Sequence, residues 1–190
     1  MYFFMKLRAR NLFLTLLFPL AIVNGQQTIF NVPTSDVLDR GKVYVELDAA
    51  FKIDKTDDFG RFSSFVPRLV VGAGNNVEVG VNVTGNIQPG DDQTTLVPTV
   101  KWRFYQNQEK DISLYAGTNV LIPVRNRSYN IGSYSYAAIS KTFGKTRLTA
   151  GGFVASKNVF ASKAVRSGGQ FGIEHTINEK VTVAADWFTG

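Results

Sequence analysis

Apolar and polar residues alternate along most of the chain after residue 42. In residues 43–53 every second residue is apolar, while the residues between them include Glu46, Asp48 and Lys52. A two-residue period is typical of a β-strand, in which successive side chains point to opposite faces. The segment therefore predicts a strand with one apolar and one charged face.

Alternation recurs in eight further segments, although it is weaker in residues 147–155 and 168–177, and residues 131–140 have no clean polar face. The eight segments are residues 61–74, 77–84, 95–105, 112–122, 131–140, 147–155, 168–177 and 181–188. None of these segments has the 3.6-residue period of an amphipathic helix. The pattern thus predicts an all-β chain with nine strands.

Short and long connections alternate between the predicted strands. Short turns are expected at residues 74–76, 106–111, 143–146 and 178–180, and longer polar loops at 55–60, 85–93, 123–130 and 156–168. Short turns on one side and long loops on the other are typical of up-and-down antiparallel transmembrane β-barrels.

A soluble β-sandwich or barrel is the alternative reading, because it also alternates apolar and polar residues. Two features favour the membrane barrel. The non-apolar faces are rich in Gly, Ser, Thr, Asn and charges of both signs, as a wet lumen would be. A tilted strand of about 10 residues spans roughly 24 Å, close to the apolar band of an outer-membrane barrel. Trp102, Phe104 and Tyr105, and Trp187 with Phe188, are candidates for aromatic girdles.

The first residues have the pattern of a cleavable signal peptide. Basic residues precede an apolar stretch at 12–23, which is shorter than a membrane-spanning helix, and small residues at positions 23 and 25 suit a cleavage site. We expect a signal peptide over residues 1–25, a periplasmic lead-in over 26–41 and the barrel over 42–190. Within the lead-in, the run "PTSD" predicts a turn and a short helical turn over residues 35–38.

Composition narrows the class further. Charged residues are 19% and aromatic residues 13% of the chain, and it contains no cysteine, so disulfides and thiolate sites are absent. Removing the signal peptide lowers the net charge of +6 by three, to +3. We therefore expect no nucleic-acid partner; the expected partners are outer-membrane lipid and small solutes, with the oligomeric state left open.

Three segments resemble a known group of proteins: "TIFNVPTSDVLDRGKVYVELD", "LVVGAGNNVEVGVNV" and "FGIEHTINEKVTVAADW". They are similar to bacterial outer-membrane β-barrels of a transporter-like family, akin to the meta-pathway phenol-degradation outer-membrane proteins. The likeness covers roughly residues 26–190. It implies an outer-membrane location and passage of small molecules, and it supplies no catalytic residues. Because barrels of this class have an even number of strands, an odd count predicts a C-terminally truncated barrel of about 12 strands.

Charged residues at the non-apolar positions are the candidate functional set. They are Glu46, Asp48, Lys52, Arg68, Glu78, Lys101, Arg103, Glu174 and Asp186. They either fill a narrow barrel with salt bridges or line a pore and set its selectivity. The basic residues Arg68, Lys101 and Arg103 come from nearby strands, and we expect them to face Glu46, Asp48 and Glu78 across the lumen.

No arrangement of residues points to catalysis. His175 is the only histidine and falls at an apolar-face position beside a short turn. No metal site or cofactor is expected. The leading hypothesis is a non-enzymatic, passive channel or transporter for small solutes in the bacterial outer membrane. The alternative is a structural or surface-binding barrel with a closed lumen and functional outer loops, and a lipid-modifying enzyme ranks last.

Overall fold

The computed structural model describes residues 32–52, 62–84, 94–125, 130–157, 159, 166–179 and 181–189. Its strands are β1 (Val43–Lys52), β2 (Phe62–Gly74), β3 (Val77–Thr84), β4 (Thr95–Asn107), β5 (Ile112–Pro123), β6 (Gly132–Phe143), β7 (Thr146–Ala155), β8 (Ser167–Asn178) and β9 (Val181–Phe188). Within these ranges no helix is long and apolar enough to cross a membrane. The predicted signal peptide and residues 26–31 of the lead-in lie outside the described residues.

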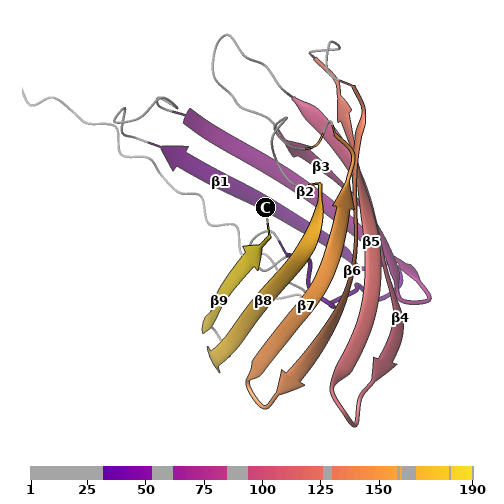
Figure 1. Cartoon of the computed structure of the whole chain (residues 1–190), viewed down its shortest axis with the longest axis vertical. Helices are drawn as coiled ribbons and strands as arrows, with labels where there is room; N and C mark the ends of the chain where they lie inside the picture. The colour runs from indigo at the N-terminus through magenta and orange to yellow at the C-terminus, as the bar shows by residue number, and fades with distance from the viewer. Residues whose placement is uncertain are drawn as a thin grey trace, which may run out of the picture.

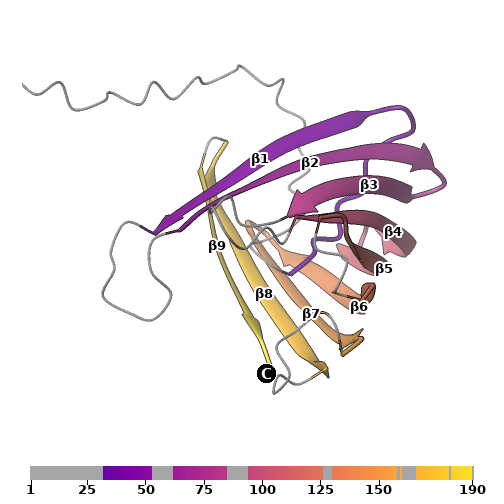
Figure 2. The same cartoon turned by 90° about the horizontal axis from the view of Figure 1, so that it is seen from above.

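All nine strands form one antiparallel sheet in which each strand pairs with the next along the chain (Figure 1). The predicted all-β, up-and-down arrangement is therefore confirmed, and β3 and β9 begin and end at the predicted residues. The sheet is strongly curved, and β1 and β9 do not pair with each other (Figure 2). Because consecutive strands are antiparallel, the short turns all lie at one end of the sheet. The predicted loops at residues 55–60 and 85–93 lie outside the described residues, as do parts of those at 123–130 and 156–168.

The convex face of the curved sheet is apolar, and the concave face carries buried charged and polar side chains together with buried apolar ones such as Val97, Tyr136 and Phe153. In β8, buried Gln170 and Glu174 alternate with exposed Phe171 and Ile173. Exposed apolar residues of the convex face include Val45, Leu47, Leu69, Val79, Trp102, Ile139, Leu148, Val183 and Trp187. The two-residue period read from the sequence therefore separates two faces of opposite character.

The turn between β2 and β3 is a tight hairpin, as predicted. Gly74, Asn75 and Asn76 have φ angles of 93°, 53° and 58°. Two-residue hairpins of the type I′ kind require positive φ at both central positions, which Asn tolerates better than most residues. These three residues are explained by the turn alone.

An irregularity in β4 changes the face of one aromatic residue. The register between β4 and β5 shifts between Arg103 and Tyr105, as at a β-bulge. Tyr105 consequently pairs with Leu114 and joins Trp102 and Phe104, so that all three rings are about half exposed. The two-residue period of residues 95–105 alone would put Tyr105 on the charged face with Lys101 and Arg103, and the bulge inverts the alternation after Arg103.

Aromatic side chains also form a cluster inside the curve. Tyr115, Tyr136 and Phe153 are buried, and the Phe188 ring lies 5.6 Å from that of Phe153. Tyr134 packs against the same cluster. The predicted place of Phe188 in an outer girdle was therefore wrong, since it shares the concave parity of Phe153.

Candidate functional site: the polar concave face and its strap

Residues 32–41, which we call the strap, cross the concave face before β1 begins (Figure 2). The strap is not helical, so the predicted helical turn over residues 35–38 was wrong. Val32 and Thr34 are fully buried, and Leu38 is 6% exposed. The strap therefore occupies the interior of the curve.

Side chains from β9 and β5 hold the beginning of the strap. The Val32 N–H donates to Asp186 Oδ2 at 2.9 Å. The Tyr115 hydroxyl donates to the Pro33 carbonyl at 2.7 Å. Beneath it, Ser140 contacts both Tyr115 and Thr149 through its hydroxyl, at 3.4 and 2.8 Å. Both anchors bind the backbone of the strap, satisfying groups that burial would otherwise leave unpaired.

An ion-pair cluster holds the middle of the strap. Arg147 on β7 donates to Glu174 on β8 through Nε at 2.6 Å and Nη2 at 2.9 Å. Its third nitrogen, Nη1, donates to Asp36 Oδ1 at 2.8 Å. The guanidinium fork suits two carboxylates at once. The ion pair between Arg147 and Asp36 therefore joins the strap to the sheet.

A second buried ion pair holds the end of the strap. Lys101 Nζ lies 2.9 Å from Glu78 Oε1, and both side chains are 5% exposed. The other oxygen of Glu78 accepts the Leu38 N–H at 3.0 Å. Glu78 thus neutralises a buried lysine and binds the strap backbone with one carboxylate.

Gly72 lets the strap approach β2. A methyl group at this position would overlap the Asp39 carbonyl oxygen and lie 2.6 Å from that of Leu38. Backbone bonds Gly41 N to Gly72 O, 2.8 Å, and Gly72 N to Lys42 O, 2.9 Å, fix the junction with β1. The glycine is required by this close approach rather than by the strand.

A third charge cluster lies on β1 and β2. Arg68 Nη1 is 3.0 Å from Glu46 Oε2, and its Nη2 is 3.4 Å from Asp48 Oδ2. The Asp48 side chain is 50% exposed, against 12% for Arg68. Asp48 is thus the more accessible acidic group of this cluster.

The structure places the sequence-predicted residues in three groups. Glu46, Asp48 and Arg68 form one cluster, Glu78 with Lys101 a second, and Glu174 and Asp186 bind Arg147 and the strap. Arg103 donates to Asn76 Oδ1 at 3.1 Å, beside the β2–β3 turn. The Lys52 side chain lies outside the described residues. The expected partners of Arg68 and Lys101 are the ones found, since Arg68 pairs with Glu46 and Asp48 and Lys101 pairs with Glu78. These pairs form between neighbouring strands and not across a lumen.

Sequence reasoning missed Asp36, Tyr115 and Arg147. Tyr115 and Arg147 stand at polar-parity positions, which was a usable signal, although Arg147 was not included among the inward charges. Asp36 offered no such signal, since its partner is 111 positions away in the sequence.

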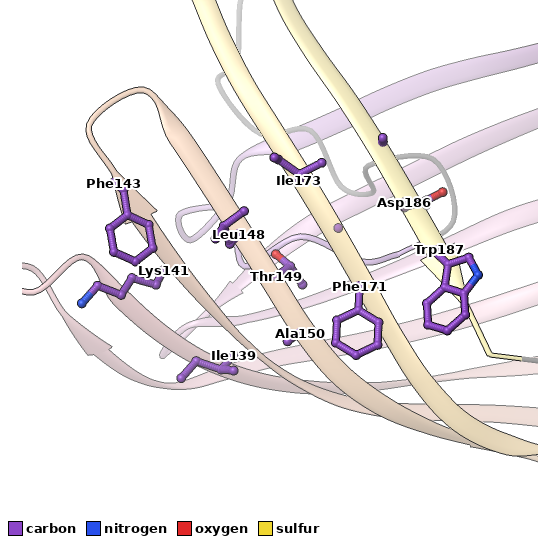
Figure 3. Close-up of a pocket in the computed structure, with 12 residues that line it drawn as sticks. Ile139, Lys141, Phe143, Leu148, Thr149, Ala150, Phe171, Ile173, Asp186 and Trp187 are labelled. Atoms are coloured by element: carbon purple, nitrogen blue, oxygen red, sulfur yellow. The ribbon is translucent and has the colours of Figure 1, made fainter.

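The described residues show no cluster of three or more residues suited to hold a metal ion. His175 is exposed, and its Nδ1 lies 2.8 Å from Thr146 Oγ1 near the β6–β7 and β8–β9 turns. A shallow groove on the convex face is lined mainly by apolar side chains such as Leu148, Phe171 and Trp187 (Figure 3).

Comparison with known proteins leaves the resemblance to phenol-degradation outer-membrane proteins as a prediction. The chain matches no protein-family profile, no curated protein and no solved structure.

Proposed function

We propose that the sheet is part of the wall of a bacterial outer-membrane β-barrel that passes small solutes. The observation that carries the proposal is the large apolar surface exposed on the convex face, together with charged side chains buried on the concave face. Large apolar side chains stand exposed on the convex face, among them Leu47 at 64% and Trp187 at 58%. Charged side chains such as Lys101 are buried on the concave face.

A soluble β-domain would favour the reverse arrangement, with apolar side chains inside and charges in water. Contiguous exposed apolar surface of this kind marks an interaction or membrane surface. In a bilayer the convex residues meet acyl chains, and the exposed rings of Trp102, Phe104 and Tyr105 suit an interfacial girdle. The edges of β1 and β9 must be paired there, because hydrocarbon cannot satisfy free backbone groups.

On this proposal the concave face lines the passage. Its charges occur as neighbouring pairs of opposite sign, such as Lys101 with Glu78, so the wall is polar and close to neutral. Such a wall suits water and small polar solutes better than it suits highly charged ones.

A second candidate is a barrel with a closed lumen whose outer loops bind a partner. The strap favours it, because Val32 and Thr34 fill part of the interior completely. Both candidates require the same membrane insertion, and conductance distinguishes them.

Reconstitution of the purified full chain separates them. Insertion is checked first by a heat-dependent gel shift and by resistance to extraction without detergent. Stepwise ion conductance in planar bilayers, with solute swelling of liposomes, is the expected result for a passage. Insertion without either signal supports the closed barrel, and extraction without detergent contradicts both.

A further inference from the structure

The strap is recognised by four side chains that come from four different strands. Asp186, Tyr115 and Glu78 bind its backbone, and Arg147 binds its single contacting carboxylate, Asp36. These strands are β9, β5, β3 and β7, so the anchors are distributed across most of the sheet. The concave face is therefore a built site for an extended segment, and the chain's own residues occupy it.

The position of the strap matters for solute passage, so its role rests on the proposed function. Glu78 and Arg147 are each the second residue of their strands, next to short turns. The middle and the end of the strap, at Asp36 and Leu38, therefore lie near the short-turn end of the concave face. A segment in this place, with Val32, Thr34, Ser35 and Leu38 buried, narrows the space along the face through which a solute would pass.

We infer that residues 32–39 are the gate of the passage, and that the Asp36–Arg147 ion pair is its latch. The latch is more accessible than the Glu78–Lys101 pair: the Asp36 side chain is 34% exposed and that of Arg147 is 20% exposed, against 5% for both Glu78 and Lys101. When Asp36 moves away, Arg147 remains paired with Glu174, so the opening of the gate leaves no unpaired buried charge at this site. Glu78 likewise keeps Lys101.

The chain also has a pivot for the movement. Gly41, the last residue of the strap, has a φ of 78°, and nothing lies within 4 Å of the position that a Cβ would occupy. A glycine with open space around it can change its backbone angles at little cost. A swing of the strap about Gly41 breaks the hydrogen bond from the Gly41 N–H to the Gly72 carbonyl, and it leaves the pairing of β1 with β2 in place.

Conductance of the full chain and three variants tests the gate. The first variant lacks residues 32–39, the second carries Asp36→Asn, and the third carries Asp39→Asn as a matched control. The Asp39→Asn substitution removes the same charge from the same strap, but the Asp39 side chain is exposed. We expect a larger single-channel conductance without the strap and an open fraction raised about tenfold by Asp36→Asn, the factor set by one charge-assisted hydrogen bond. Asp39→Asn should behave as the wild type.

A peptide added in trans provides a second measurement on the strap-deleted protein. A synthetic peptide of residues 32–40 should block its current, and the same peptide with Asp36→Asn should need about a tenfold higher concentration. Heat-dependent gel shifts verify that each variant inserts. If the deleted protein conducts as the wild type does and the peptide has no effect, the gate is overturned while the passage stands. If neither the full chain nor any variant conducts, both the gate and the passage are refuted.

Discussion

Lys101 and Glu78 face each other on neighbouring strands, with Nζ and Oε1 2.9 Å apart and both side chains 5% exposed. Removing one member of a buried pair leaves an uncompensated charge, whereas replacing both members is often nearly neutral. We expect Lys101→Met to lower the free energy of unfolding by about 3–5 kcal/mol. Urea titration of the folded protein, followed by Trp fluorescence, measures it.

The double variant Lys101→Met with Glu78→Gln is the matched test of that reason. Glutamine keeps an oxygen for the Leu38 N–H, which Glu78 accepts at 3.0 Å, and carries no charge. The double variant should therefore recover most of the free energy of unfolding that Lys101→Met loses. A double variant that is less stable than Lys101→Met would show that the pair contributes more than it costs to bury.

Gly72 offers a test of how the strap is seated. A methyl group there would overlap the backbone of Asp39, which cannot move aside without moving the strap. Overpacking of this kind costs about 1–3 kcal/mol, so Gly72→Ala should lower the midpoint of urea unfolding and speed proteolysis of the strap.

Gly152→Ala is the control for that substitution. A Cβ at Gly152 would meet only the Gly168 carbonyl oxygen, at 3.4 Å, which is an ordinary contact. Its effect should stay within about 0.5 kcal/mol. Equal effects of the two substitutions would refute the claim that Gly72 is there for the strap.

The sequence predicted the strands well because each strand carries its own signal. Residues 77–84 alternate apolar and polar side chains from end to end, and β3 has those bounds. The faces follow from the same period, so the burial of Glu78 and Lys101 on one face was foreseeable. The β4 irregularity was not, because the alternation of residues 102–105 reads the same with or without a bulge.

The strap could not be predicted for a different reason. Its conformation depends on partners such as Glu78, 40 positions away, and Asp186, 154 positions away. A segment of mixed polar and apolar residues with one proline reads locally as a turn, and that is how residues 35–38 were misread. Contacts between distant residues set its path, so no local pattern in the chain encodes it.

Asp48 should contribute to ion selectivity if the concave face lines a passage, as the proposed function requires. Its side chain is 50% exposed on the concave face, although it is ion-paired with Arg68. Asp48→Lys should move the reversal potential of a salt gradient toward anion selectivity. The shift should be large near about 0.01 M salt and small near about 1 M, because the Debye length falls from about 30 Å to about 3 Å.

Glu109→Lys is the control for this charge reversal, since Glu109 lies in the exposed turn between β4 and β5. It changes the net charge equally without touching the concave face. A reversal potential that responds to Glu109→Lys as strongly as to Asp48→Lys would place the selectivity outside the concave face.

Ile173 on the convex face distinguishes lipid from water as the surroundings of the sheet. Its side chain is 44% exposed, between Leu148 and Ala185 on the neighbouring strands. In water, replacing an exposed isoleucine by lysine changes stability by no more than about 0.5 kcal/mol. In a bilayer, a lysine near the midplane of a barrel costs about 2–4 kcal/mol. We expect Ile173→Lys to reduce the fraction that folds into lipid vesicles, measured by the heat-dependent gel shift.

Asn119→Lys is the opposite control, because Asn119 has concave parity, pairs with Thr99 and Tyr134, and is partly buried. In a water-filled barrel the lysine can extend into the lumen, so insertion should be close to that of the wild type. In a soluble domain the concave face is the core, and the same lysine would lose its hydration there. The membrane proposal therefore requires Ile173→Lys to be the more damaging variant. The reverse order, with Asn119→Lys more damaging, would establish a soluble sheet whose convex face meets water.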